Sequence, residues 1–316
     1  MTDAPLLATS PEALASAVEA LLSGALVAFP TETVYGLGAD ATNETAVARI
    51  YEAKRRPSFN PLISHVGDVE AAFALGVFGP EARALAERYW PGPLTIVVER
   101  APDCPIAWLT SSGLNSIALR VPAHPLARDL LRRVARPVAA PSANISGRVS
   151  PTEAGHVAVE LGDQVTLILD AGPCAVGIES TVVDLSGDWP LLLRPGAITR
   201  EMLEEILGEV GTPDAAAPLA SPGMLASHYA PNCLVRLNAA APRDGEVFLG
   251  FGATGEGTGS PSLSAAGDLV EAAANLFRML RDLDQPGITG IAVAPVPEHG
   301  LGAAINDRLR RAAAPR

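Results

Sequence analysis

A cationic cluster in an acidic chain is the first place where residue types in this sequence indicate chemistry. Residues 50–66 read IYEAKRRPSFNPLISHV, so Lys54, Arg55 and Arg56 are consecutive in a protein whose formal net charge is −12. Of the 23 basic residues, Lys54 is the only lysine. A lysine presents a compact ammonium where an arginine presents a planar fork. The position of this single lysine therefore favours a site that binds an anion and needs the ammonium.

A second interpretation of the cluster is purely structural. Cations at the C-terminus of a helix oppose the helix macrodipole, and a helix that begins at an N-cap near Asn43 would end at about Lys54. The residues that follow favour a binding site instead. Asn60 precedes a proline, and His65 lies at the end of a short apolar strand, where α/β sheets tend to bind ligands. A lone histidine is usually structural, so both interpretations stay open on this segment alone.

Small polar residues recur after other predicted strands. They occur in PTETVYG (30–36), PSANISG (141–147), GIESTVVD (177–184) and LLRPG (192–196). Hydroxyl and amide groups in such places suit a phosphate or a ribose, and they suit a turn or capping network equally well. Their repeated position at strand ends is what favours a ligand site. The candidates are Thr31, Thr33, Ser142, Asn144, Ser146, Ser180, Thr181 and Arg194.

Two glycine patterns raise the question of dinucleotide binding. GFGATG (250–255) matches GxGxxG after a predicted strand, but loop composition continues beyond it, whereas the fingerprint needs a helix to open at the last glycine. GLGADA (36–41) precedes a helix but is separated from its strand by PTETVY. We predict that both are turns. No P-loop motif is present, since the only lysine follows an alanine.

The elements that must position these residues alternate between apolar strands and helices. The periodicity predicts strands at 25–29, 61–66, 94–99, 116–121, 137–140, 166–170, 180–185 and 190–194. It predicts helices at 11–23, 43–54, 80–89, 125–135, 151–161 and 199–208. This pattern indicates a large α/β sheet with helical cover.

The composition changes over residues 208–232, which are rich in Ala, Pro and Gly and read as a linker. Beyond them we expect strands at 233–237, 246–250 and 290–294 and helices at 267–283 and 301–313. These elements form a smaller unit of the βαβ type. A chain of 316 residues is also long enough for two domains.

Composition narrows the class of protein. The chain is 48% hydrophobic and 18% charged, which predicts a well-buried core. It contains no run of eighteen apolar residues and no basic leader, so we expect a soluble protein without a membrane segment. Cys104, Cys174 and Cys233 form no CxxC pair and are expected to be reduced thiols in the cytoplasm. The acidic balance disfavours non-specific binding of nucleic acid.

Seven segments, in this order, closely resemble the YrdC-like domain of L-threonylcarbamoyladenylate synthases: PTETVYGLG, IYEAKRRPSFNPLISHV, WPGPLT, ALRVP, PSANISG, IESTVVD and LRPG. SPGMLASHYAP (221–231) and GLGAAINDRLRRAA (300–313) resemble the two-domain form of that family, although Leu225 and Ala226 replace residues that are often basic and aromatic there. The resemblance implies a large twisted mixed-sheet catalytic domain over 1–210, a linker or lid over 211–232, and a small Rossmann-like α/β domain over 233–316.

The resemblance also implies an activity. Members of the family make L-threonylcarbamoyl-AMP and pyrophosphate from L-threonine, bicarbonate and ATP. Other proteins then transfer the product to the adenosine beside the anticodon of certain tRNAs. By position in the motifs, Lys54 and Arg56 would be catalytic and would face the phosphates and carboxylates.

The same positions imply two sets of binding residues. The threonine pocket would consist of Thr33, His65, Arg120 and Ser180. The ATP contacts would be Arg56, Asn60, Ser116, Ser142, Asn144, Ser150, Arg194 and Tyr229, the last of them in the linker. Mg²⁺ would accompany ATP, held by phosphates and water, because the sequence contains no acidic cluster dedicated to it.

Three alternatives stay open on the sequence. One is an RNA-binding YrdC-like module without turnover, which the acidic charge disfavours, so we expect tRNA binding to be weak or indirect. Another is a carbamoyltransferase with a YrdC-like domain inside a larger chain, for which this chain leaves no room. The third is a nucleotide-binding regulator, which only an assay of turnover separates from an enzyme.

Overall fold

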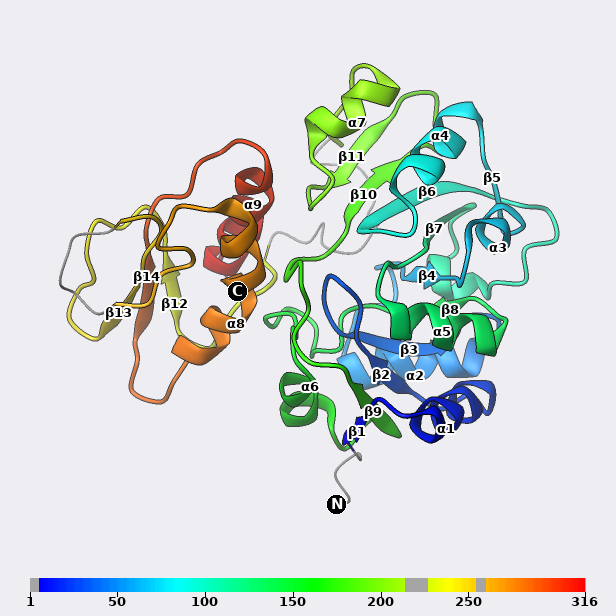
Figure 1. Ribbon diagram of the computed structural model, residues 1–316, viewed down its shortest axis with the longest axis horizontal. Helices are drawn as coiled ribbons and strands as arrows, with labels where there is room; N and C mark the ends of the chain where they lie inside the picture. Colours follow the sequence, from blue (N-terminus) through cyan, green and yellow to red (C-terminus); the bar gives the residue numbers. More distant parts are fainter. Residues whose placement is uncertain (1–5, 214–226, 254–259, 316) are drawn as a thin grey trace.

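The computed structural model describes residues 6–213, 227–253 and 260–315 (Figure 1). The larger domain contains, in chain order, β1 (Leu6–Ala8), α1 (Pro11–Leu22), β2 (Val27–Phe29), β3 (Gly36–Asp40), α2 (Glu44–Lys54), β4 (Ile63–His65), α3 (Val69–Phe73), β5 (Gly76–Val77), α4 (Pro80–Tyr89), β6 (Leu94–Arg100), the 3-10 helix η1 (Trp108–Ser111), β7 (Ser116–Arg120), α5 (Pro125–Val134), β8 (Val138–Ala139), α6 (Ala154–Leu161), β9 (Leu167–Asp170), β10 (Thr181–Asp184), β11 (Leu191–Arg194) and α7 (Arg200–Leu207).

The strands form one mixed sheet in the order β1-β9-β2-β3-β8-β4-β7-β6-β10-β11, with β5 paired to β6. Successive strand residues face opposite sides, as β2 illustrates. Val27 and Phe29 join a core cluster with α1 and α5, whereas Ala28 joins the cluster that contains α2, α4 and α6. Helices therefore cover both faces of the sheet, as the sequence predicts.

Side-chain caps begin the helices where the sequence places them. Ser10 accepts a hydrogen bond from the backbone N–H of Ala13 at 3.1 Å, and Asn43 accepts one from Ala46 at 3.2 Å. The second helix ends at Lys54 because Arg55 adopts a left-handed conformation with φ of 50°. This turn leaves Arg55 exposed while Lys54 and Arg56 are buried.

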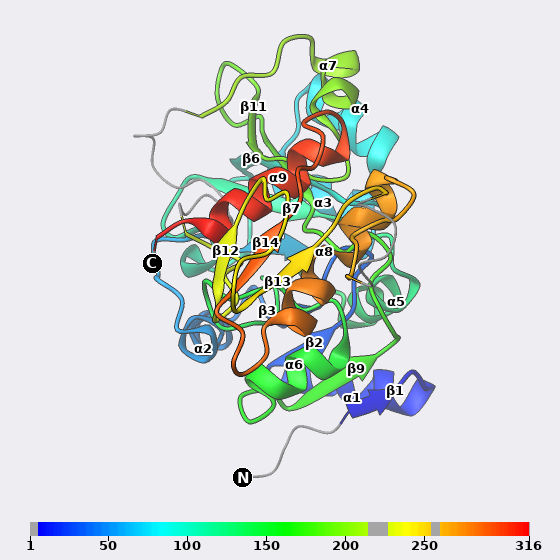
Figure 2. The same cartoon turned by 90° about the vertical axis from the view of Figure 1, so that its left-hand side faces the viewer.

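The C-terminal domain is a three-stranded parallel sheet with two helices. Its elements are β12 (Leu234–Arg236), β13 (Glu246–Leu249), α8 (Leu269–Leu283), β14 (Gly290–Val293) and α9 (Leu301–Ala313), with the strand order β12-β14-β13. Figure 1 shows the two helices on the side that faces the larger domain, and Figure 2 shows the same domain from its outer side. Within the described residues, no helix combines the length and apolar character needed to cross a membrane.

Apolar packing joins the two domains. Val34, Val149 and Ile178 of the larger domain are buried in the same cluster as Leu276 and Phe277 of α8. Gly177 lies where the approach is closest: its φ is 74°, and a Cβ there would lie 2.5 Å from the Cα atom of Ala274. The helix backbone therefore packs directly against this glycine.

The structure confirms all the predicted strands and helices within a few residues at their ends, and it confirms the α/β class. The prediction of a turn at GLGADA is wrong, because residues 36–40 are the buried strand β3, antiparallel to β2. Gly38 allows this pairing: a Cβ there would lie 2.8 Å from the ring of Phe29. The strands β1 and β5 and the short helices α3 and η1 were not expected from the periodicity.

The second glycine pattern, GFGATG, is described only up to residue 253. Gly250 forms a bridge with Ser262, and the next helix begins at Leu269. The segment SPGMLA of the linker motif also lies outside the described residues, whereas His228 and Tyr229 lie within them.

We expect Gly177→Ala to destabilise the protein more than Gly172→Ala. Both glycines have positive φ, but a Cβ at position 172 meets nothing within 4 Å, whereas at 177 it would clash with α8. Forcing atoms into a packed contact costs about 1–3 kcal/mol. Urea unfolding of the two variants measures the difference, and equal losses would show that strain in the backbone, not contact between the domains, sets the cost.

Candidate functional site

A polar pocket lies where the larger domain meets the C-terminal part of the linker. Eight of the residues named from the sequence line it: Thr33, Arg56, His65, Arg120, Ser142, Ser180, Arg194 and Tyr229. Glu179 and His228 also line it. The pocket therefore combines several arginines with small hydroxyl groups.

Arg120 is fixed at the end of β7 by a buried ion pair. Its guanidinium donates to Oε1 of Glu32 at 2.6 Å, to Oγ1 of Thr33 at 3.0 Å and to the carbonyl of Gly92 at 3.3 Å. The second carboxylate oxygen of Glu32 accepts from the backbone N–H of Ala123. Burial alone would raise the pKa of the Glu32 carboxyl. The charge and the hydrogen bond of Arg120 outweigh this effect, so the pKa is lower than its ordinary value.

His65 is the residue paired with Arg120 in the parallel ladder between β4 and β7. Burial, and then the positive charge of Arg120, lower the pKa of its imidazole to about 3. The ring is therefore neutral at physiological pH. Its Nδ1 atom is buried and has no hydrogen-bond partner among the described residues.

Ser180 and Arg194 form a second fixed group in the pocket. Arg194 donates from Nη2 to Oγ of Ser180 at 3.0 Å and from Nε to the Ser180 carbonyl at 2.9 Å. The Ser180 hydroxyl also lies 2.8 Å from Oγ1 of Thr95, because β10 pairs with β6. Burial lowers the pKa of the Arg194 guanidinium.

Lys54 does not line the pocket but holds the loop that follows β8. Its ammonium donates to the carbonyls of Ser142 and Asn144, both at 2.5 Å. Burial, and then the charge of Arg56, lower the pKa of this lysine well below its ordinary value, while Glu160 and Glu179 act in the opposite direction.

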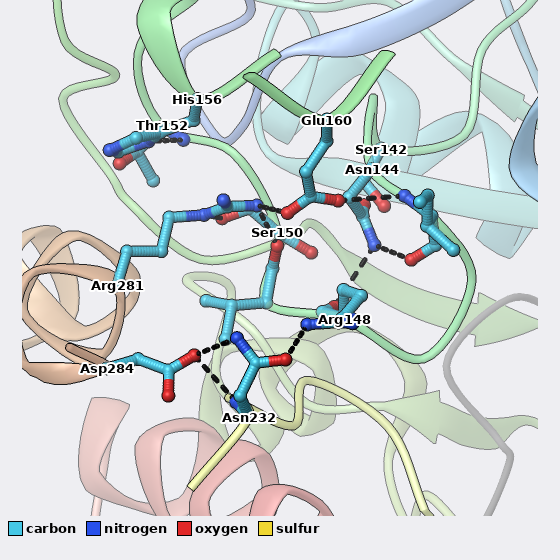
Figure 3. A network of polar contacts seen from close by, with 12 residues as sticks. Ser142, Asn144, Arg148, Ser150, Thr152, His156, Glu160, Asn232, Arg281 and Asp284 are labelled. Carbon is cyan, nitrogen blue, oxygen red and sulfur yellow. Dashed lines mark hydrogen bonds and ion pairs between the residues drawn. The ribbon is translucent and has the colours of Figure 1, made fainter. Parts of the chain in front are cut away.

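Figure 3 shows how the rest of this loop is held. Asn144 donates to the carbonyls of Ile145 and Arg148 at 2.7 and 3.0 Å. Glu160 of α6 accepts from the backbone N–H of Ile145 at 3.0 Å and pairs with Arg281 of α8 at 2.7 Å. The C-terminal domain thus takes part in fixing a loop that carries three of the predicted nucleotide contacts.

Of these three residues, Ser142 lines the pocket; Asn144 does not, and neither does Ser150. The Ser150 hydroxyl donates to Oε1 of Glu179 at 2.5 Å. Glu179 lines the pocket and is paired through Oε2 with Arg308 of α9 at 2.9 Å. A contact from the second domain therefore reaches the pocket through one carboxylate.

Tyr229 brings the linker over the pocket. Its φ is 61°, its side chain is buried, and its ring stacks on Phe277 with centroids 5.3 Å apart. The guanidinium carbon of Arg308 lies 5.3 Å from the Tyr229 ring centroid. The phenol has no hydrogen-bond partner among the described residues, and burial raises its pKa to about 12.

Two of the predicted residues lie at the other end of the strand pair. Ile63 of β4 pairs with Ala118 of β7, so Asn60 and Ser116 precede the paired segment that ends in His65 and Arg120. Neither Asn60 nor Ser116 lines the pocket. The side-chain amide of Asn60 is buried and has no hydrogen-bond partner among the described residues. The backbone carbonyl of Asn60 accepts a hydrogen bond from Nε of Arg56 at 3.1 Å.

Sequence reasoning missed three charged residues that set the charge of the site: Glu32, Glu179 and Arg308. Both carboxylates lie inside motifs that carry predicted polar contacts, PTETVYG and IESTVVD. Each carboxylate directly precedes a predicted contact, Thr33 or Ser180, and this adjacency could have indicated that it belongs to the site. Arg308 lies inside GLGAAINDRLRRAA, but nothing in that segment indicates its partner, which is 129 positions away along the chain.

Comparison with known proteins gives matches over both domains. A family model described as Telomere recombination (Sua5/YciO/YrdC) matches residues 19–196, and one described as Threonylcarbamoyl-AMP synthase, C-terminal domain, matches residues 198–314. A threonylcarbamoyl-AMP synthase of Bacillus subtilis is 40% identical, with 97% of this chain and 94% of that protein covered. A threonylcarbamoyl-AMP synthase of Pyrococcus abyssi is 44% identical, with 92% of this chain and 90% of that protein covered.

Comparison of the fold with solved structures points to the same family. The crystal structure of P. abyssi Sua5 complexed with L-threonine is similar with a TM-score of 0.89 and 38% sequence identity, over 99% of this chain and 98% of that one. The comparisons confirm the family resemblance and the two-domain fold that the motifs predict.

We expect the buried neutral imidazole of His65 to make the protein less stable in acid. Its pKa of about 3 in the folded state lies below the ordinary 6.5, so between these values only the unfolded chain binds the proton. This contribution is complete above pH 6.5 and is lost as the pH falls toward 3. His65→Asn should reduce the loss of unfolding free energy between pH 7 and 5 by about 2 kcal/mol.

Urea unfolding at several pH values measures this slope. His299→Asn is the matched control, because His299 is exposed. A wild-type slope no steeper than that of His65→Asn would contradict the prediction.

Proposed function

The chain belongs to the threonylcarbamoyl-AMP synthase family and is an enzyme. We propose that it makes L-threonylcarbamoyl-AMP and pyrophosphate from L-threonine, bicarbonate and ATP. The observation that carries the proposal is the pocket that Arg120, Arg56 and Arg194 line together. Such a pocket suits a substrate carboxylate and a polyphosphate held side by side.

The threonine end of the pocket would lie at Arg120. An arginine has five N–H donors, and three of those of Arg120 are used by Glu32, Thr33 and Gly92. The remaining donors would bind the threonine carboxylate, while the ion pair with Glu32 prevents the guanidinium from turning. Neutral His65 and the Ser180 hydroxyl supply polar groups for the threonine side chain and amine.

The reaction needs no covalent nucleophile from the protein. The threonine amine and bicarbonate form a carbamate and release water. A carbamate oxygen then attacks the α-phosphorus of ATP, the bond to the β-phosphate breaks, and pyrophosphate leaves with the electron pair. The protein would contribute orientation and positive charge. Arg56 and Arg194 would face the phosphates, and Lys54 would hold the loop of Ser142 and Asn144 against them.

The proposal extends to the nucleotide and the linker. The buried amide of Asn60 and the phenol of Tyr229 have no partners among the described residues, which supports contacts with a bound molecule. Ser116 would contact ATP at the same end as Asn60. Closure of the linker at Tyr229 would keep water from the mixed anhydride.

We propose that Mg²⁺ enters the site with ATP. The pocket carboxylates are each ion-paired, Glu32 to Arg120 and Glu179 to Arg308. Among the described residues, no group of three His, Cys, Asp or Glu side chains is placed to hold a metal ion. Phosphate oxygens and water would then be the ligands, and the ion would neutralise phosphate charge.

The product would pass to proteins that transfer it to the adenosine beside the anticodon of tRNA. Direct binding of tRNA would be weak, because the formal net charge of the chain is −12. The reaction would take place in the cytoplasm, where ATP and tRNA are supplied. An RNA-binding module without turnover is not favoured, since the relatives over the full chain are named as synthases.

Release of pyrophosphate tests the proposed function directly. With ATP present, we expect release to require both L-threonine and bicarbonate, because only the carbamate attacks the nucleotide. The assay omits each substrate in turn and follows pyrophosphate and threonylcarbamoyl-AMP. Equal release without threonine would reduce the protein to an ATP hydrolase and would contradict the proposal.

We expect Lys54→Arg to lower turnover by at least about tenfold, although it conserves the charge. The ammonium fits between two carbonyls in a site that is 1% exposed, and the planar guanidinium is larger and directs its donors differently. Arg55→Lys, at the exposed neighbouring position, is the matched control. Wild-type turnover in Lys54→Arg would show that the lysine is not required.

A further inference from the structure

We propose that Arg308 of the C-terminal domain is a positioning residue that completes the nucleotide site by neutralising Glu179. The inference rests on the proposed function, since it assumes that the pocket binds a polyphosphate. It assigns the C-terminal domain a role in the charge of the site that is separate from holding the linker.

Glu179 is an unexpected residue in a pocket that binds anions. It lines the pocket, precedes Ser180 in the chain, and accepts a hydrogen bond from Ser150 at 2.5 Å. Its side chain is 7% exposed. A carboxylate here would repel the phosphates of ATP through a medium that screens poorly, so its charge has to be balanced.

The balancing cation comes from α9. Arg308 is fully buried, and its Nε atom lies 2.9 Å from Oε2 of Glu179. Its Nη1 atom pairs with Asp307 of the same helix at 2.8 Å, and its guanidinium carbon lies 5.3 Å from the Tyr229 ring centroid. One side chain thus contacts the pocket carboxylate and the linker residue predicted to contact the nucleotide.

Removal of Arg308 would leave Glu179 buried without its ion-pair partner, with the Ser150 hydrogen bond and the charge of Arg194 still acting on it. The pocket would therefore become more negative. Nucleotide affinity would fall for that reason, with a smaller effect on threonine, whose carboxylate lies nearer Arg120. The domains would stay together, because Phe277 and Leu276 still pack against Ile178 and Arg281 still pairs with Glu160.

The experiment measures binding of α,β-methylene-ATP to the full chain by calorimetry, with the Michaelis constants for ATP and threonine. For Arg308→Met we expect the dissociation constant of the nucleotide to rise at least about tenfold, with a smaller change in the threonine constant. Arg310→Met is the matched control on the same helix, because Arg310 pairs with Glu298 at the surface. It should bind as the wild type does.

The double variant Arg308→Met/Glu179→Gln separates charge from packing. It lacks both charges, so we expect it to recover most of the nucleotide affinity, which a purely structural role of Arg308 does not predict. Arg308→Lys keeps the positive charge, and its dissociation constant for the nucleotide should stay within about threefold of the wild-type value. This variant tests the role of charge if Arg308→Met does not fold.

Two results would overturn the inference alone: wild-type affinity in Arg308→Met, or a double variant no better than Arg308→Met. A lysine variant as weak as the methionine variant would do the same. A wild-type chain that bound no α,β-methylene-ATP and released no pyrophosphate would instead overturn the proposed function, and this inference with it.

Discussion

The burial of several cations in one pocket is the constraint on which the rest of the structure depends. Arg56, Arg120 and Arg194 line the pocket, and Lys54 contacts the backbone of Ser142 in its lining. All four side chains are buried, and burial of such groups is costly unless they are paired or hydrogen-bonded. Burial lowers the pKa of Arg56 to about 10 and that of Lys54 well below its ordinary value. An anion bound beside these cations would stabilise their charged forms.

The fold places fixed partners around these cations. Arg120 has Glu32, Lys54 has two carbonyls of the loop after β8, and Arg56 has the carbonyls of Asn60 and Pro61. Most of these partners are backbone groups, whose positions follow from strand pairing and from the left-handed turn at Arg55. Donors held in this way need little reorganisation during a reaction, which is the main means by which such a site stabilises developing charge.

Local sequence patterns predicted much of this arrangement, but they did not predict the contacts between residues that are far apart in the chain. The cap at Asn43, the apolar periods and the motifs located the elements and eight of the pocket residues. The strand at residues 36–40 was missed because its glycines read as a turn, although Gly38 leaves room for the ring of Phe29. Glu179 and Arg308 were missed because their pairing depends on how two domains dock, which no local pattern indicates.

Docking of the domains is tied to the chemistry because residues of the pocket lining contact the C-terminal domain: Glu179 pairs with Arg308 of α9, and Tyr229 stacks on Phe277 of α8. The cluster that joins them contains Val34 and Val149, which are adjacent in sequence to Thr33 and Ser150, and Ile178, which lies two residues before Ser180. Movement of α8 or α9 would therefore move those contacts as well. The mixed anhydride of the proposed reaction is prone to hydrolysis, so a pocket covered by the linker would exclude water when it is closed and would release the product when it opens. The C-terminal domain would then act on both the charge and the accessibility of the site, which a tether alone does not require.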